Sequence, residues 1–332
     1  QALVMLNLLP DATQATSRWQ YWKARILALT GEPTETTAAT EIYRQLAGGR
    51  NFYGFLAADR LGLPYNFEDE PADVGMEEIL SLESTPGIER ALELFAMGDL
   101  VQARREWFST TRQFSHREKI VAAQVGRKWG WHKQAIQSMI DAEAWNDLSV
   151  RFPLAYLDTF VSAARKTDIP SQWGMAIARQ ESAFMADARS GAGAMGLMQL
   201  LPDTARMTAR RNGIPYKSRQ DLIDPHTNIT LGTAYLGAML RRFNNNRVIA
   251  SAAYNAGPSR VSGWQDGSLP LDVWIETIPF TETRNYVQNV LMFSTIYGRL
   301  TGHDIPLIYP SEWEDFAAEK PLQSVALNPA QP

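Results

Sequence analysis

Cysteine is absent from the sequence and histidine is scarce, and both features narrow the chemistry that the chain can perform. Without cysteine there is no disulfide framework and no thiolate nucleophile. The four histidines stand at positions 116, 132, 226 and 303, a spacing that matches no metal-ligand pattern. No phosphate-binding glycine loop follows a predicted strand. We therefore expect neither a metal nor a cofactor.

Long apolar runs and a strong charge bias are also missing. No stretch reaches about 18 uninterrupted apolar residues, so no transmembrane helix is expected. The formal net charge is −4 over 332 residues, without a long basic run, which disfavours a nucleic-acid partner. A chain of this length suggests about two domains. Its start, QALVMLNLLP, has no initiator methionine and no basic leader, and we expect it to continue a longer helical chain.

The most informative stretch is residues 171–200, which begins as a predicted helix. Pro170 precedes the helix, and Ser171 can cap its first N–H groups. Near the predicted end of the helix stands Glu181, which by helical spacing belongs to an otherwise apolar face. The apolar residues of that face are Trp173, Ile177 and Phe184.

The surroundings of Glu181 favour a role as a general acid. Loss of water and the negative end of the helix dipole both raise the pKa of a carboxyl in such a place. A carboxyl that stays protonated near neutral pH can donate a proton to a leaving group. The alternative is that Glu181 turns to solvent or pairs with an arginine such as Arg179.

The segment after this helix contains several glycines, followed by one flexible apolar side chain and one polar side chain. Gly191, Gly193 and Gly196 leave room for the close approach of backbone or ligand. Met198 offers an apolar contact, and Gln199 offers an amide that can both donate and accept hydrogen bonds. The alternative is an ordinary glycine-bearing loop with Met198 in a core.

Four motifs carry a resemblance to a known family. They are ARQESAF, SGAGAMGLMQLLPDTA, AAYNAGP at 252–258 and IPFTETRNYV at 278–287. In this order they resemble the C-terminal catalytic domain of the soluble lytic transglycosylases, which belong to the lysozyme-like group that cleaves peptidoglycan. The resemblance implies a lysozyme-like domain preceded by a long array of helices.

The last two motifs place polar residues at helix ends. Tyr254 and Asn255 fall in the last turn of a predicted helix that Gly257 stops. Glu282 falls in the first turn of a predicted helix over 282–299, where the dipole favours an ionised acid. The structural alternatives are a core tyrosine, a C-terminal cap and a favourable helix start.

The remaining pattern predicts a mostly α-helical chain. A faint repeat with an offset of 32 residues places each of two glycines between two helical patterns, which is typical of a helix–turn–helix array. Plain helical packing is the alternative. The repeated residues are Gly98, Gln102 and Ala103, then Gly130, Gln134 and Ala135. We also expect a turn over 33–40 and, before it, an apolar helix face made by Trp19, Trp22 and Ile26.

Three regions are expected. Residues 1–150 form a helical-repeat, superhelical region, and residues 151–310 form a lysozyme-like, α-rich catalytic domain with at most a very small β element. Residues 311–332 form a C-terminal tail. Pro153 and Pro170 mark the first boundary, and the family resemblance supports the superhelix.

The resemblance also implies a reaction. Most glycosidases use two carboxylates, whereas the strong motif here supplies only Glu181. The resemblance implies cleavage of the β-1,4 bond between N-acetylmuramic acid and N-acetylglucosamine, assisted by the acetamido oxygen of the substrate. Glu181 acts first as acid and then as base on the C6 hydroxyl, which leaves a 1,6-anhydromuramic end. The expected glycan-binding residues are Ser190, Met198, Gln199, Tyr254, Asn255, Glu282 and Tyr286.

The partners implied are peptidoglycan glycan strands and muropeptides, with other cell-wall enzymes as further candidates. The implied place is the periplasm, and the implied role is cell-wall turnover. Two alternatives stay open: a lysozyme-type hydrolase on the same fold, and a non-catalytic protein that binds peptidoglycan.

Overall fold

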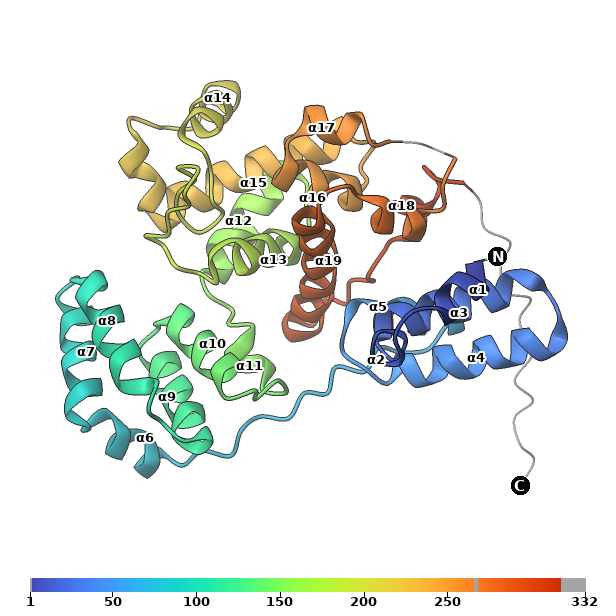
Figure 1. The fold of residues 1–332 in the computed structure, drawn as a ribbon. Helices are drawn as coiled ribbons and strands as arrows, with labels where there is room; N and C mark the ends of the chain where they lie inside the picture. Colours follow the sequence, from blue (N-terminus) through green and yellow to red (C-terminus); the bar gives the residue numbers. More distant parts are fainter. Residues whose placement is uncertain (1, 266–267, 318–332) are drawn as a thin grey trace. The chain divides into compact units, whose positions relative to one another are not determined.

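The structure is a computed structural model that describes residues 2–265 and 268–317. Helices dominate these residues, and no β-strand is assigned within them (Figure 1). Two isolated antiparallel bridges, Arg189 with Met195 and Met195 with Leu200, are the β pairing seen there. The prediction of a mostly α fold with at most a very small β element is confirmed.

The chain forms two compact units. The first contains the described residues of 1–68, 243–292 and 306–332, and the second contains 69–242 and 293–305. Each unit therefore combines segments that are distant in the sequence. The predicted boundaries at 150 and 310 are not decided by this grouping and stay predictions. Residues 318–332 of the predicted tail lie outside the described residues.

Helices from both ends of the chain build the first unit. They are α1 (Ala2–Asn7), α2 (Asp11–Gln14), α3 (Ser17–Thr30), α4 (Pro33–Ala47), α5 (Phe52–Leu61), α16 (Arg247–Ala256), α17 (Pro258–Ser262), α18 (Leu271–Thr277), α20 (Pro310–Trp313) and the first part of α19 (Thr281–Thr301). Helix α3 packs on α4, and α4 packs on α5. The fully buried rings of Tyr21, Tyr43 and Phe55 fill the space among these three helices.

One expectation for this unit is wrong. Residues 33–40 are not a turn but the first half of α4, which Pro33 opens in the favoured first position. The Thr37 hydroxyl donates to the Pro33 carbonyl at 2.9 Å, so the threonine-rich stretch satisfies its polar groups within the helix. In α3, the predicted stripe is only half-buried, and the buried positions are Tyr21, Ala24, Arg25 and Leu27.

A buried carboxylate explains why an arginine of α3 points inward. Asp272, at the start of α18, accepts hydrogen bonds from Tyr21 Oη at 2.8 Å, Arg25 Nε at 3.0 Å and an Arg60 terminal nitrogen at 2.8 Å. Burial alone raises the pKa of Asp272, but the two guanidinium groups outweigh it and hold that pKa below its ordinary value. The cluster joins α3 and α5 to α18.

A second buried ion pair fixes the C-terminal segment of the same unit. Arg247 opens α16, and its Nε lies 2.8 Å from Glu312 Oε1 of α20. Both side chains are almost fully buried. The Asn246 amide also donates to the Glu312 carbonyl at 2.9 Å. Residues 310–313 are therefore part of the packed unit.

The second unit begins with successive helix pairs and continues with the helices around α13 (Figure 1). Its helices are α6 (Met76–Glu83), α7 (Pro86–Ala96), α8 (Leu100–Thr111), α9 (His116–Lys128), α10 (His132–Asp141), α11 (Leu148–Arg151), α12 (Leu157–Thr167), α13 (Ser171–Ser182), α14 (Pro202–Asn212), the 3-10 helix η1 (Arg219–Ile223), α15 (Pro225–Arg242) and the end of α19.

The predicted helix–turn–helix repeat is confirmed. Helix α7 packs on α8, and α9 packs on α10. Gly98 and Gly130 sit in the two turns with φ of 81° and 66°, a left-handed backbone that glycine adopts without strain. Ala103 and Ala135, five residues after each glycine, are buried, and Ala135 lies against Gly126 of the paired helix α9. A cluster that includes Trp131 forms the core beneath these pairs.

None of the helices in the described part of the chain is long and apolar enough to cross a membrane.

The Asp272 cluster generates a stability prediction. Replacing Asp272 by Asn leaves the buried guanidinium of Arg25 and the partly buried one of Arg60 without this counter-charge, so we expect a loss of about 3–5 kcal/mol in unfolding free energy. Urea unfolding at neutral pH measures the loss. The matched control is Asp203→Asn, because Asp203 pairs with Arg206 at a surface position where its side chain is 93% exposed; that loss should stay below about 1 kcal/mol.

The pH dependence of the unfolding free energy provides a second test of the same cluster. Because the folded-state pKa of Asp272 is lowered, its contribution is complete above the ordinary aspartate pKa and is lost as the pH falls through the lowered value. The stability gap between wild type and the Asp272→Asn variant should therefore narrow at low pH. Equal losses for the Asp272 and Asp203 variants would contradict the assignment.

Candidate active site

Helix α13 carries Glu181 one residue before its end at Ser182. The predicted cap is wrong, because Pro170 occupies the N-cap position and Ser171 is already helical. The Ser171 hydroxyl donates to its neighbour Gln172 at 3.3 Å and caps no backbone N–H. Glu181 itself is half-buried.

The apolar face of α13 is confirmed only in part. Trp173 and Ile177 are fully buried on the helix. Phe184 is also buried, but it lies beyond the helix end, and both Ala183 and Phe184 have a left-handed backbone, with φ of 49° and 63°. Two consecutive non-glycine residues in this region cost about 1–3 kcal/mol each, so the surrounding packing must hold them. Such strain is common at functional sites.

Aromatic rings provide that packing. The Phe184 ring lies 6.5 Å from Tyr297 and 6.2 Å from His132, measured between ring centroids. Burial lowers the pKa of His132 and so favours its neutral ring. Sequence reasoning weighed His132 only as a metal ligand and missed its place beside the turn that follows Glu181.

Arg179, the arginine considered as a partner for Glu181, is buried among other groups. Its Nε donates to the Arg151 carbonyl at 2.8 Å. Its guanidinium lies 5.3 Å from the ring centroids of both Phe152 and Phe293. Burial lowers the pKa of Arg179. These contacts anchor the last turn of α13 against the unit's aromatic core.

The loop after α13 is tied back to the helix that carries Glu181. The Ser182 hydroxyl donates to the Leu197 carbonyl at 2.8 Å. Because Ser182 directly follows Glu181, this bond fixes the end of the helix against the glycine-containing segment. A buried hydroxyl paired across the fold leaves no periodic signal, which is why sequence reasoning missed it.

The side chain of Asn228, on α15, holds the same loop from the other side. Its Oδ1 accepts from the Met198 N–H at 2.8 Å, and its Nδ2 donates to the carbonyls of Met195 at 3.0 Å and Leu222 at 2.9 Å. Asn228 is fully buried. These bonds satisfy the Met198 N–H and the Leu222 carbonyl, and they add a second donor to the Met195 carbonyl, which also accepts from the Leu200 N–H at 3.0 Å. We refer to these three contacts as the Asn228 clasp.

Glycines make the clasp possible. A Cβ on Gly196 would lie 2.0 Å from the Leu222 carbonyl oxygen and 2.2 Å from Asn228 Nδ2, so the prediction of close backbone approach is confirmed there. Gly191 and Gly193 instead face open space. On α15, a Cβ on Gly232 would lie 2.3 Å from the sulfur of Met198.

Three of the predicted glycan-binding residues lie on this loop in different environments. Met198 is fully buried against Gly232, as in the core alternative. Gln199 is half-buried, and its Nε2 donates to the carbonyls of Ala188 and Gly196, so only its amide oxygen is left to accept from a ligand. Ser190 is exposed, and its hydroxyl accepts from the Ala194 N–H at 3.0 Å.

An ion pair extends from this loop to the helix pairs. Arg104 of α8 reaches both carboxylate oxygens of Asp187, at 3.1 and 2.8 Å. Asp187 is the first acidic residue after Glu181 in the sequence. The bidentate geometry holds its carboxylate in a fixed orientation.

The other predicted glycan-binding residues belong to the first unit. Tyr254 and Asn255 occupy the last turn of α16, as predicted, and the helix stops at Gly257. Asn255 Oδ1 accepts from the Thr283 hydroxyl at 2.6 Å, which brings the third and fourth motifs together. Glu282 is exposed in the first turn of α19, while Tyr286 is buried one turn later. Within the described residues, no three His, Asp or Glu side chains gather as metal ligands.

Three stretches of the chain match known families. Residues 81–148 match the family described as "Soluble lytic murein transglycosylase L domain". Residues 158–271 match "Transglycosylase SLT domain". Residues 277–305 match "Soluble lytic transglycosylase helical domain".

Individual relatives extend the likeness over nearly the whole chain. A soluble lytic murein transglycosylase of Salmonella typhimurium is 38% identical over 313 residues, which cover 93% of this chain and 48% of the relative. Lytic transglycosylase Slt of Pseudomonas aeruginosa, solved as an inactive mutant, has a TM-score of 0.88 at 46% identity, over 94% of this chain and 51% of that one.

A 70-kDa soluble lytic transglycosylase in complex with bulgecin A has a TM-score of 0.87 at 37% identity, over 93% of this chain and 50% of that one. The chain therefore spans about half the length of the relatives that it matches.

The Asn228 clasp generates a prediction for the site. Asn228→Ala leaves the Met198 N–H and the Leu222 carbonyl without their side-chain partner in the interior, whereas the Met195 carbonyl still accepts from the Leu200 N–H at 3.0 Å. We therefore expect the variant to lower the unfolding free energy by at least about 2 kcal/mol. The Met198 amide should also lose protection in hydrogen exchange. The control is Asn285→Ala, at an exposed position of α19. Unchanged exchange at Met198 would show that the clasp does not hold the loop.

Proposed function

The chain belongs to the soluble lytic transglycosylase family, and we propose that it cleaves the β-1,4 bond between N-acetylmuramic acid and N-acetylglucosamine in peptidoglycan. The product end is a 1,6-anhydromuramic acid. Glu181 is the catalytic residue, and it acts first as acid and then as base.

One observation supports the proposal beyond the family likeness: the first acidic residue after Glu181 in the sequence, Asp187, is already engaged in an ion pair. Asp187 is held by both terminal nitrogens of Arg104. A carboxylate held this way is poorly placed to attack a sugar carbon. If Glu181 is the one carboxylate that takes part, the nucleophile comes from the substrate, and the acetamido and C6 hydroxyl groups of muramic acid provide it.

In the proposed reaction, Glu181 gives one proton and takes one back, so the residue returns to its starting protonation state. The carboxyl gives its proton to the glycosidic oxygen as the bond from the muramic C1 to that oxygen breaks, while the acetamido oxygen stabilises the charge that develops at C1. The C6 hydroxyl then bonds to C1, and the Glu181 carboxylate takes up the hydroxyl proton. Because the attacking group is tethered to the reacting ring, it has a large effective concentration over solvent water.

The remaining residues are proposed to position the glycan. Their hydroxyl, amide and carboxylate groups suit acetamido and hydroxyl groups of sugars. These residues are Ser190, Met198, Gln199, Tyr254, Asn255, Glu282 and Tyr286. Met198, which is buried, acts through the shape of the loop rather than through an exposed side chain. The proposed substrates are peptidoglycan glycan strands and muropeptides, the proposed place is the periplasm, and other cell-wall enzymes are further candidate partners.

Glu181→Gln tests the proposal. The amide preserves the size of the side chain but cannot transfer the proton, so release of muropeptides from purified sacculi should fall by at least about 100-fold. The fold, followed by circular dichroism and thermal unfolding, should be unchanged. The comparison variant is Glu282→Gln, which should lose less activity because Glu282 is proposed only to position the glycan. Near-normal turnover by the Glu181 variant would exclude Glu181 as the acid.

A further inference from the structure

An arginine of the helix pairs reaches the segment that follows Glu181, although it takes no direct part in the proposed cleavage. Arg104 of α8 donates to both carboxylate oxygens of Asp187, at 3.1 and 2.8 Å. Arg104 lies within residues 81–148 and Asp187 within residues 158–271, and these two stretches match different families. The ion pair therefore joins the helical region to the domain that carries Glu181.

This ion pair lies partly in water, so its effect on stability is small. The side chains of Arg104 and Asp187 are 27% and 29% exposed. Ion pairs in such places contribute little to the free energy of unfolding, because solvent screens the two charges. The two parallel contacts instead fix the direction of the Asp187 carboxylate. The consequence of the pair therefore depends on what the backbone around Asp187 holds.

The backbone around Asp187 forms two successive turns that end at Ala188. The Met185 N–H donates to the Ser182 carbonyl, and the Ala188 N–H donates to the Met185 carbonyl, each at 3.2 Å. Asp187 lies in the second turn, directly before Ala188, which is buried. Because the carboxylate of Asp187 is held from α8, the second turn is held at the same place.

The Ala188 carbonyl orients a side chain that is proposed to bind glycan. It accepts from the Gly196 N–H at 2.9 Å and from Gln199 Nε2 at 3.2 Å. Gln199 Nε2 also donates to the Gly196 carbonyl at 2.8 Å, which leaves the amide oxygen of Gln199 to accept from a ligand. The backbone of Gln199 is left-handed, with φ of 47°, a conformation that a non-glycine residue keeps only where its surroundings hold it. The direction of the amide oxygen therefore depends on the place of the Ala188 carbonyl.

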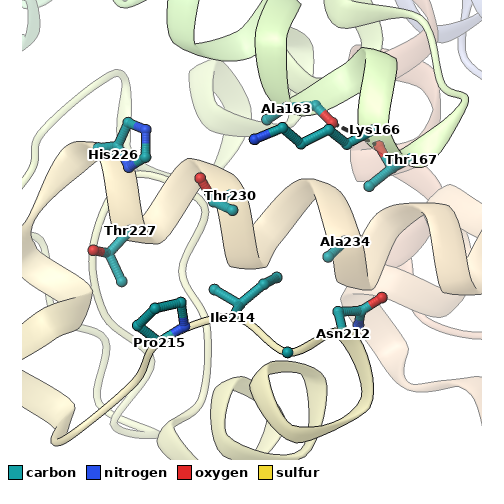
Figure 2. Close-up of a pocket in the computed structure, with 11 residues that line it drawn as sticks. Ala163, Lys166, Thr167, Asn212, Ile214, Pro215, His226, Thr227, Thr230 and Ala234 are labelled. Atoms are coloured by element: carbon teal, nitrogen blue, oxygen red, sulfur yellow. Dashed lines mark hydrogen bonds between the residues drawn. The ribbon is translucent and has the colours of Figure 1, made fainter.

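The Asn228 clasp supports a different part of the loop, because its hydrogen bonds go to the backbone of residues 195, 198 and 222. Helix α15, which carries Asn228, also borders a cavity together with α12 and the segment after α14 (Figure 2). Neither Asp187 nor Ala188 lines that cavity. The contact from α8 is therefore a separate support, which acts on the turn that ends at Ala188.

We infer that Arg104 is a positioning residue for the amide of Gln199. It acts through Asp187, whose fixed carboxylate keeps the Ala188 carbonyl where that carbonyl accepts from Gln199 Nε2. The inference rests on the proposed function, in which Gln199 binds the glycan. Through this contact the helical region influences substrate binding, although no residue of 81–148 is among those proposed to touch the substrate.

Arg104→Ala in the full chain tests the inference without substrate. In a ¹⁵N-labelled sample the side-chain amide signals of Gln199 should shift, and the Gly196 N–H should exchange with solvent about threefold to tenfold faster. The midpoint of thermal unfolding should stay within about 4 °C of wild type, because the ion pair is partly exposed. The matched control is Arg105→Ala, which removes the same charge from an exposed position of α8 and should leave both signals unchanged. Unchanged Gln199 signals in the Arg104 variant, or the same changes in the Arg105 variant, would overturn the inference.

Steady-state cleavage of soluble peptidoglycan glycan strands is the second test. In Arg104→Ala the KM should rise about threefold to tenfold, because one hydrogen bond to the glycan is weakened. The kcat should change less than about twofold, because Glu181 is held through Ser182 and not through Asp187. Asp187→Asn should raise KM by a similar factor, and the double variant should do no more than either single variant. Additive effects, or a fall in kcat at unchanged KM, would overturn the inference. Absence of turnover in the wild-type chain would contradict only the proposed function, because the Gln199 signals are measured without substrate.

Discussion

The amide side chain of Asn228 is the interaction on which the candidate active site depends. It binds the Met198 N–H and the carbonyls of Met195 and Leu222, all of them buried backbone groups in or beside the glycine-containing loop. The Ser182 hydroxyl then links the same backbone, at Leu197, to the residue after Glu181. The position of the carboxyl therefore follows from a short series of buried hydrogen bonds, and glycines at 196 and 232 provide the space that this series needs.

In the first unit, buried ion pairs rather than neutral hydrogen bonds hold the helices together. Asp272 forms ion pairs with two arginines of the N-terminal helices, and Arg247 forms an ion pair with Glu312 of the C-terminal segment. Breaking such a pair leaves an uncompensated buried charge, so each pair specifies one arrangement of its helices strongly. The packing of this unit positions the polar residues at the end of α16 and the start of α19. Within it, Asn255 and Thr283 are hydrogen-bonded to each other.

Local chemistry could be predicted from the sequence, and long-range pairing could not. The helix around Glu181, the turns at Gly98 and Gly130, and the helix end before Gly257 all depend on neighbouring residues, and the structure confirms them. The prediction of a turn over residues 33–40 was wrong because a threonine-rich stretch can form either a turn or a helix. Here the threonine hydroxyl donates to a backbone carbonyl within α4. Asn228 and Asp272 have their roles only because of partners that are distant in the sequence. The pattern of a single sequence does not show which distant residues pair.

The central claim is that one carboxylate cleaves the glycan without water, because the next acid in the sequence, Asp187, is held by Arg104 and the C6 hydroxyl is tethered to the reacting ring. Digestion of purified sacculi in H₂¹⁸O, followed by mass spectrometry of the muropeptides, tests it most directly. The account predicts products lighter by one water than those of a lysozyme, with no ¹⁸O at the muramic C1. Products that carry ¹⁸O at C1 as the main species, with reducing muramic ends, would contradict it and identify a hydrolase.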